Sequence, residues 1–162
     1  MTYSELNAAL DALIRDVPHP LSNLSNATAL LWEGLDRLNW AGFYLTAPSS
    51  GVPGGELVLG PFQGKTACIE IPFGRGVCGT AAAENRTQLV PDVHLFPGHI
   101  ACDSASASEI VVPLRVGGQV VGVMDLDSPE KGRFTEEDRA GLEGFARILE
   151  TSLPEDFPSR LL

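Results

Sequence analysis

Three cysteines are the most reactive residues of this sequence: Cys68, Cys78 and Cys102. A thiolate is a strong nucleophile, whereas a buried thiol is often an inert small hydrophobic side chain. Cys102 lies in the irregular polar segment 91–108, where burial is hard to achieve. Redox chemistry at Cys102 is therefore one interpretation, and an inert thiol is the other. Cys68 and Cys78 lie in or beside predicted strands and turns, so we expect them to be more buried.

Acidic side chains form the second group with possible chemistry. Asp125 and Asp127 are two residues apart in an apolar stretch, and this spacing places both carboxylates on one face of a strand. Such acids cost desolvation unless a polar or cationic group meets them, or else they form the solvated end of the strand. Glu109 joins them only if the hairpin around Gly117 and Gly118 has an odd register, for instance through a bulge. We predict that register.

Two further patterns are weak signals. Residues 74–79 match G-x-G-x-x-G, but no parallel crossover follows, so we interpret these glycines as a tight turn and a helix cap rather than a dinucleotide site. His94, His99 and Cys102 could contribute to a metal site. A structural zinc site needs four ligands, however, and the sequence has no C-x-x-C. We therefore expect neither a metal nor a cofactor.

The elements that position these residues follow from hydrophobic periodicity. Helices with one apolar face are predicted over 2–17, 21–38 and after Thr135, and a short helix is predicted over 80–85. Strands rich in aromatic and β-branched residues are predicted over 40–46, 56–62, 67–71, 88–90, 109–115 and 120–126. The last two strands are almost continuously apolar, so we expect their hairpin in mid-sheet with both faces covered. This order predicts an α+β domain with helices packed on a mostly antiparallel sheet.

Composition limits the class of protein. The chain has 162 residues, 44% of them hydrophobic, which suits one domain over 1–154 with a short tail at 155–162. Its 11 basic and 21 acidic side chains give a net charge of −10, which disfavours nucleic acids and anionic membranes as partners. The N-terminus does not resemble a signal peptide, and no apolar stretch reaches the roughly 20 residues of a membrane span. We expect a cytoplasmic protein whose cysteines are not a structural disulfide framework.

Several segments together resemble the free methionine-(R)-sulfoxide reductase family. The resemblance runs from about residue 5 to residue 150 and includes counterparts of all three family cysteines. It implies a GAF fold, often as a homodimer. Generic GAF domains share the glycine turn and the final hairpin but not this cysteine set. The segments that carry it, besides Cys102, are Asn39-Trp-Ala-Gly-Phe-Tyr-Leu45, Leu59-Gly-Pro-Phe-Gln-Gly-Lys65, Gly74-Arg-Gly-Val-Cys-Gly-Thr80, Val90-Pro-Asp-Val-His94 and Val121-Gly-Val-Met-Asp-Leu-Asp-Ser128.

The resemblance implies a thiol mechanism. The Cys102 thiolate would attack the sulfur of free methionine sulfoxide, and protonation of the oxygen would give methionine and a cysteine sulfenic acid. Cys68 would resolve this acid as a disulfide, with Cys78 as a possible alternate, and thioredoxin or a similar dithiol would reduce the disulfide. Asp103 and the nearby acids should raise the pKa of Cys102, and we expect the substrate's ammonium and loop amides to compensate.

The resemblance also assigns the acids and two aromatic residues to the substrate pocket. Glu109, Asp125 and Asp127 would hold the ammonium group of a free amino acid, and one of them would donate a proton to the sulfoxide oxygen. Trp40 and Tyr44 project from one strand face and would wall the methyl-sulfur end, although their pattern fits ordinary core packing equally well.

A second class of function is a binding module without catalysis. GAF domains commonly bind small molecules, and a thiol sensor of redox state is a further alternative. The net charge of −10 disfavours phosphate-bearing ligands such as cyclic nucleotides.

Overall fold

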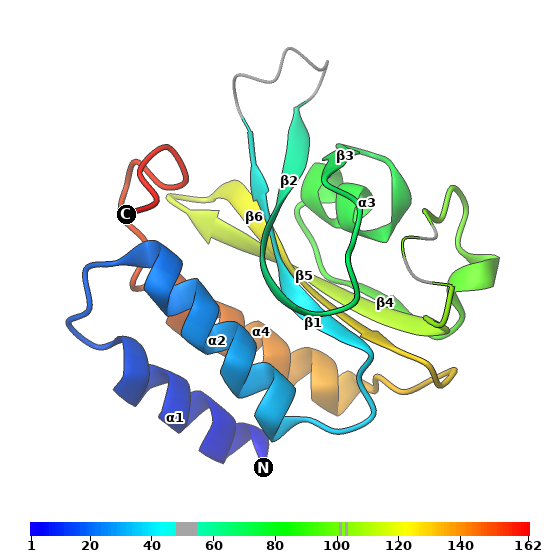
Figure 1. Cartoon of the computed structure of the whole chain (residues 1–162), viewed down its shortest axis with the longest axis horizontal. Coiled ribbons are helices and arrows are strands. Elements are labelled where there is room, and N and C mark those ends of the chain that lie inside the picture. The colour runs from blue at the N-terminus through cyan, green and yellow to red at the C-terminus, as the bar shows by residue number, and fades with distance from the viewer. Residues whose placement is uncertain (48–54, 101, 103) are drawn as a thin grey trace.

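The computed structural model describes residues 1–47, 55–100, 102 and 104–162. Within these residues, an antiparallel six-stranded sheet in the order β3-β2-β1-β6-β5-β4 forms the centre of the fold (Figure 1). The strands are β1 (Trp40–Thr46), β2 (Glu56–Gly64), β3 (Glu70–Pro72), β4 (Gln88–Val90), β5 (Ser108–Val116) and β6 (Gln119–Ser128). The helices are α1 (Tyr3–Ile14), α2 (Pro20–Gly34), α3 (Gly76–Glu84) and α4 (Glu136–Glu150), with a short 3-10 turn at Val93–Leu95.

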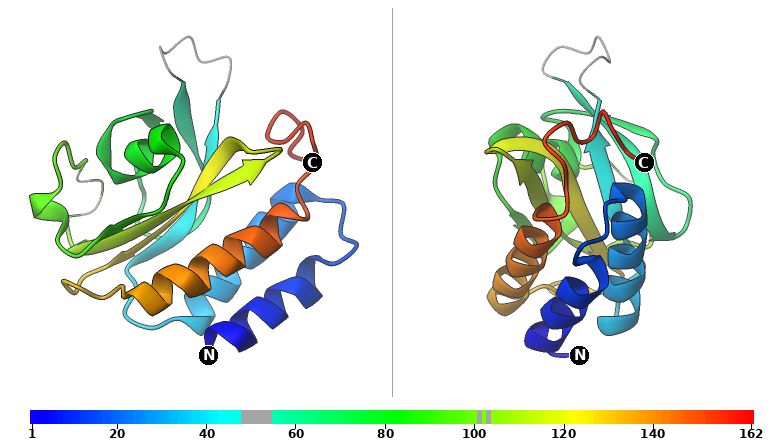
Figure 2. Two further views of the ribbon diagram at one scale, coloured as in Figure 1. Left: turned by 180° about the vertical axis from the view of Figure 1, so that it is seen from behind. Right: turned by 90° about the vertical axis from the view of Figure 1, so that its left-hand side faces the viewer.

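Helices cover both faces of the sheet, as the order of predicted elements indicates (Figure 2). α2 and α4 pack on one face, and α1 packs against both of them. α3 packs on the opposite face, against β5 and β6. The hairpin of β5 and β6 therefore lies in mid-sheet with both faces covered, which confirms the prediction from its apolar sequence and the α+β class.

Alternation along the strands divides the interior into two cores. In β1, Ala41 and Phe43 belong to the core beneath α1, α2 and α4. Trp40 and Tyr44 belong to the second core, which lies on the α3 side together with Val123 of β6. Successive side chains of a strand point to opposite faces, so one short segment contributes to both cores. The α3 side of the sheet is thus the side on which Trp40 and Tyr44 meet the acidic residues of β6.

The hairpin register brings Glu109 opposite Asp127. Val116 pairs with Gln119 across a two-residue turn, which alone would give the other register. One extra residue of β6, Val121, lies between the partners of Leu114 and Arg115, and this bulge shifts the rest of the hairpin by one residue. The predicted odd register is confirmed, and it places all three acids on the α3 face.

Capping confirms two of the predicted helix starts. Thr2 forms a capping box with Glu5 at the start of α1, and Thr135 forms one with Asp138 at the start of α4. The inner face of α4 is buried as expected, through Leu142, Phe145, Ala146 and Leu149.

Four predicted boundaries are wrong for local reasons. α1 ends at Ile14 rather than at residue 17, because the backbone leaves the helical conformation at Arg15 (ψ 125°). α2 ends at Gly34 rather than near residue 38, because the chain turns extended at Leu35 and left-handed at Arg37 (φ 57°). α3 begins at Gly76, inside the segment predicted as a turn, and so includes Cys78. β3 begins at Glu70 rather than at residue 67, and the carbonyl of Cys68 accepts a hydrogen bond from the side chain of Tyr44.

The C-terminal segment packs against the helical core. Phe157 is buried there, and Leu161 packs against the same cluster. The Leu161 carbonyl accepts a hydrogen bond of 3.0 Å from the backbone nitrogen of Leu21. No helix among the described residues combines the length and the apolar character needed to cross a membrane.

Gly42→Ala is expected to destabilise the fold by about 1–3 kcal/mol. Gly42 lies on β1 where the pairing with β2 shifts register, and a Cβ atom there would lie 2.7 Å from both the Phe62 Cα and the Pro61 carbonyl oxygen. These are backbone atoms, which cannot rotate away. Thermal unfolding measures the loss. Gly144→Ala in α4 is the control, because its Cβ would meet only the end of the Asn7 side chain. Equal effects of the two variants would refute the explanation.

Candidate active site

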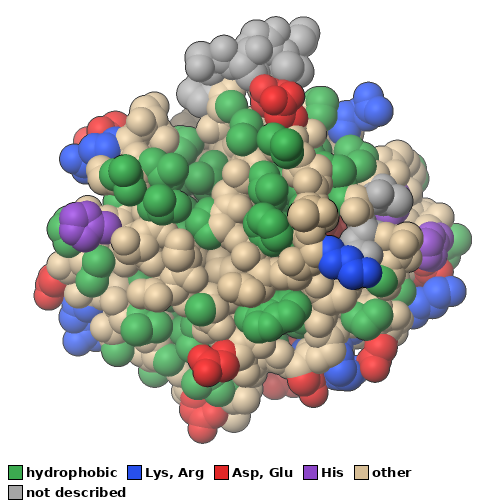
Figure 3. Space-filling view, in the orientation of Figure 1, with side chains coloured by type: hydrophobic (Ala, Val, Ile, Leu, Met, Phe, Trp, Pro, Cys, Tyr) green, Lys and Arg blue, Asp and Glu red, His purple; other side chains and the backbone are tan. Residues whose placement is uncertain are grey.

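A pocket that is partly open to solvent lies between α3, the sheet and the loop that precedes β5. Figure 3 shows one face of the molecule in the orientation of Figure 1. Hydrophobic side chains are spread over the middle of this face, and most charged side chains lie towards its edge. The pocket collects seven of the eight site residues predicted from the sequence: Trp40, Tyr44, Cys78, Cys102, Glu109, Asp125 and Asp127.

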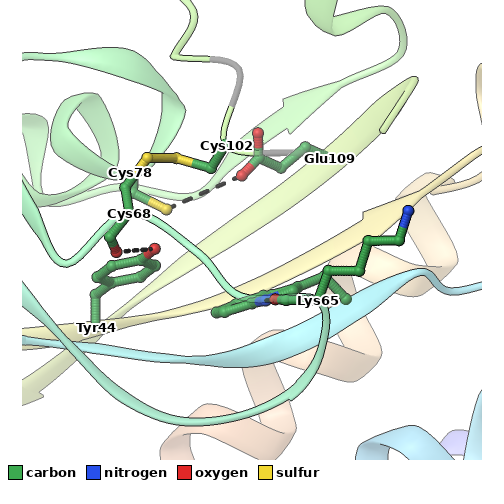
Figure 4. The surroundings of a disulfide bond; sticks show 7 residues. Tyr44, Lys65, Cys68, Cys78, Cys102 and Glu109 are labelled. Atoms are coloured by element: carbon green, nitrogen blue, oxygen red, sulfur yellow. Dashed lines mark hydrogen bonds between the residues drawn. A yellow bond between two sulfur atoms is a disulfide. The ribbon is translucent and has the colours of Figure 1, made fainter. Parts of the chain in front are cut away.

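The eighth predicted residue, Cys68, is joined to Cys102 by a disulfide whose Cα atoms are 5.6 Å apart (Figure 4). Both residues are half-buried, so the expectation that Cys68 is more buried is wrong. The Tyr44 hydroxyl donates a hydrogen bond of 2.8 Å to the Cys68 carbonyl and thereby fixes the segment before β3. Cys78 is a free, buried thiol, as expected. Asp103, beside Cys102, lies outside the described residues.

Glu109 and Asp125 are buried in this pocket, whereas Asp127 is half-buried. The sequence left open whether Asp125 and Asp127 are the solvated end of a strand, and for Asp125 burial excludes that interpretation. The Cys78 thiol lies 3.9 Å from Glu109 Oε2 and donates a weak hydrogen bond to it (Figure 4). The Oδ1 atom of Asp125 has no hydrogen-bond partner among the described residues. A cation that entered the pocket would supply a partner for this oxygen.

Burial and mutual repulsion change the acidity of the cluster. Burial raises the pKa of Glu109 well above its ordinary value, and the neighbouring Asp125 and Asp127 raise it further. Burial raises the pKa of Asp125 as well, partly offset by hydrogen bonds from Glu109 and Cys78. The pKa of the Cys78 thiol is raised by burial and by the same acids. A carboxyl group with a raised pKa keeps its proton towards neutral pH, so the pocket contains a proton donor.

Aromatic rings form another wall of the pocket. Trp40 stacks on Phe62 with ring centroids 5.3 Å apart and on Tyr44 at 5.9 Å. Its indole nitrogen donates a hydrogen bond of 3.1 Å to the Lys65 carbonyl. These contacts hold Trp40 in one orientation, so the part of its ring that lines the pocket is a rigid apolar surface.

The two histidines of the loop do not join Cys102 in a metal-ligating group among the described residues. The rings of His94 and His99 meet edge to face, with their centroids 6.5 Å apart. His99 also lines the pocket, and burial lowers its pKa. Sequence reasoning missed His99 as a pocket residue, along with Arg75 and Ile100, because the path of an irregular loop and the start of α3 could not be read from periodicity.

Comparison with known proteins connects this site to a family. A model of the GAF domain family matches residues 5–153. The free methionine-R-sulfoxide reductase of Escherichia coli (strain K12) is 53% identical over 151 residues, which cover 93% of this chain and 88% of that protein.

Solved structures give the same connection. The reduced form of fRMsr from Staphylococcus aureus superposes with a TM-score of 0.88 at 49% identity, covering 94% of this chain and 95% of that one. Free methionine-R-sulfoxide reductase from Neisseria meningitidis, in complex with its substrate, has a TM-score of 0.86 at 45% identity and covers 93% of this chain and 87% of its own.

Proposed function

This chain belongs to the GAF domain family and, within it, to the free methionine-R-sulfoxide reductases, and from this premise we propose that it reduces free methionine (R)-sulfoxide to methionine. The observation that carries the proposal is the Cys68–Cys102 disulfide beside a pocket that contains buried acids. A disulfide in that position is the product that a thiol reductase leaves after one turnover.

The first step is attack of the Cys102 thiolate on the sulfoxide sulfur. The sulfur–oxygen bond of the sulfoxide breaks, and the oxygen passes to the Cys102 sulfur. Methionine is released, and Cys102 remains as a sulfenic acid. Glu109 donates the proton that the sulfoxide oxygen needs, because its pKa is raised and it lines the pocket.

The second step removes the sulfenic acid. The Cys68 thiol attacks the Cys102 sulfur, a disulfide forms and water leaves. The 5.6 Å between the two Cα atoms of the oxidised pair is an ordinary disulfide separation. Both cysteines are half-buried, so thioredoxin or a similar dithiol can approach them and restore the two thiols.

Substrate selection follows from the charge of the pocket. Asp125 and Asp127 hold the ammonium group, which neutralises part of the cluster and so assists ionisation of the Cys102 thiol. Trp40 and Tyr44 contact the methyl and sulfur end. A peptide-bound methionine sulfoxide has an amide in place of the ammonium and leaves the acids without a cation.

N-acetylmethionine sulfoxide is therefore expected to react at least about 100-fold more slowly, in kcat/KM, than free methionine sulfoxide, because it leaves buried acids unpaired. Methionine release measured by amino-acid analysis compares the two substrates. The methyl ester of methionine sulfoxide is the matched control, since it keeps the ammonium. Equal rates for the free and the acetylated substrate would contradict the assigned role of the acids.

The assay that tests the function uses reduced protein, free methionine (R)-sulfoxide and dithiothreitol. We expect catalytic release of methionine, and we expect thioredoxin with its reductase to replace dithiothreitol. Ligand binding without any methionine release would instead support a non-catalytic GAF binding module, and disulfide formation by peroxide alone would support a redox sensor.

A further inference from the structure

Cys78, Glu109 and Asp125 form a potential metal site in the pocket. The proposed reaction uses Glu109 and Asp125 for other roles and does not use Cys78. One ligand atom each of Cys78, Glu109 and Asp125 lies within 4.8 Å of the others. All three residues are buried, and all three line the pocket, so a cation reaches them from solvent. We propose that this cluster binds Zn²⁺, or a similar divalent cation of intermediate softness, and that the bound metal reversibly blocks the pocket.

The unpartnered oxygen of Asp125 is an independent indication that a cation binds here. Asp125 is only 5% exposed, and its Oδ1 accepts no hydrogen bond from any residue in the described part of the chain. A buried carboxylate oxygen without a partner is costly, and a cation placed against it removes that cost. The substrate's ammonium is one such cation, and a metal ion that enters the same pocket is another.

The thiol determines which metal fits. Mg²⁺ and Ca²⁺ require six or more oxygen ligands, and a sulfur ligand does not suit them. Zn²⁺ accepts sulfur and carboxylate ligands in a tetrahedral site and often has three protein ligands with water in the fourth position. Cys78 and the two carboxylates supply such a set, and Cys78 releases its proton to solvent when the metal binds.

The site persists when the redox-active pair is oxidised. Cys68 and Cys102 are then joined to each other, and Cys78 is the free thiol. Metal binding is therefore separable from turnover, although the expected competition with substrate rests on the proposed function. The bound ion would contact Glu109 and Asp125, so substrate and metal cannot occupy the pocket together.

Titration of the oxidised protein with Co²⁺, a spectroscopic substitute for Zn²⁺, tests the proposal. We expect binding of one ion per chain with a thiolate-to-cobalt charge-transfer band, which only Cys78 can supply in this state. Zn²⁺ should displace the cobalt, and Mg²⁺ should not. Loss of one ligand should weaken binding more than about 100-fold, the upper range for loss of a supporting residue. Cys78→Ala should also lose the charge-transfer band, and Asp125→Asn should keep it while binding weakly.

His94→Ala is the control for a metal site formed by the loop histidines. If cobalt bound at such a site, this variant would lose the cobalt, and the bound metal would show no thiolate band in any variant. Circular dichroism and thermal unfolding establish that each variant is folded. Absence of the charge-transfer band, or the same Co²⁺ affinity in wild type and in a folded Cys78→Ala, would overturn the metal site. Displacement of cobalt by free methionine tests the competition separately. Cobalt that stays bound in excess methionine, in a protein that still reduces the sulfoxide, would limit the proposal to a site without inhibition.

Discussion

Cys102→Ser is expected to reduce methionine formation at least about 10⁴-fold, because a serine hydroxyl is a far weaker nucleophile than a thiolate and cannot carry the sulfoxide oxygen as a sulfenic acid. Cys102 lines the pocket and forms the disulfide with Cys68, so its sulfur is the one that both substrate and partner thiol reach. Steady-state assays with free methionine (R)-sulfoxide and dithiothreitol measure the loss.

Cys68→Ser is the matched control, because it removes the other half of the same disulfide. Without added dithiol, this variant should release one methionine per chain and then stop with a sulfenic acid at Cys102, which dimedone traps. Cys78 should not replace Cys68, because burial and the acids keep its thiol protonated and it donates to Glu109. Turnover that survives in Cys102→Ser, or a Cys68→Ser variant that releases no methionine at all, would contradict the assignment.

Glu109→Gln is expected to lower kcat/KM by about 10²–10⁴-fold and at the same time to make the protein more stable above neutral pH. The first effect follows from loss of the proton donor. The second follows from linkage, because burial and neighbouring acids raise the pKa of Glu109 well above its ordinary 4.5. Folded Glu109 keeps its proton at pH values where unfolded Glu109 has released it, so the contribution of Glu109 to stability is largest below pH 4.5 and declines as the pH rises towards the folded pKa.

Thermal unfolding of wild type and variant at pH 5 and pH 8 measures this effect. The wild-type midpoint should fall between the two values by more than that of Glu109→Gln. Glu155→Gln is the control, since it removes the same charge from an exposed position. If the wild type and Glu109→Gln lose equal stability between pH 5 and pH 8, Glu109 does not have the acidity assigned to it here.

The elements that position the site were largely predictable because their signals are local. Capping boxes at Thr2 and Thr135, alternation in β1 and the two-residue spacing of Asp125 and Asp127 each depend on a few neighbouring residues. The position of Glu109 required one long-range inference, the hairpin register, and the bulge of β6 supplies the physical reason.

The features that could not be predicted depend on tertiary contacts. The pairing of Cys68 with Cys102 spans 34 residues and two irregular segments, so nothing local distinguishes Cys68 from Cys78 as the partner. α3 begins at Gly76, and this early start places Cys78 on a helix that faces the acids. The start could not be predicted, because a glycine-rich sequence favours a turn at this position equally well. His99 enters the pocket through the path of a loop without periodicity.

A single turnover in the absence of reductant tests the central claim most directly. Fully reduced protein is mixed with one equivalent of free methionine (R)-sulfoxide under anaerobic conditions, and methionine, free thiols and disulfide-linked peptides are then measured. One methionine per chain, loss of two thiols and a peptide pair that joins Cys68 to Cys102 are the predicted result. Methionine release without loss of thiols, a disulfide that includes Cys78, or no methionine at all would contradict it.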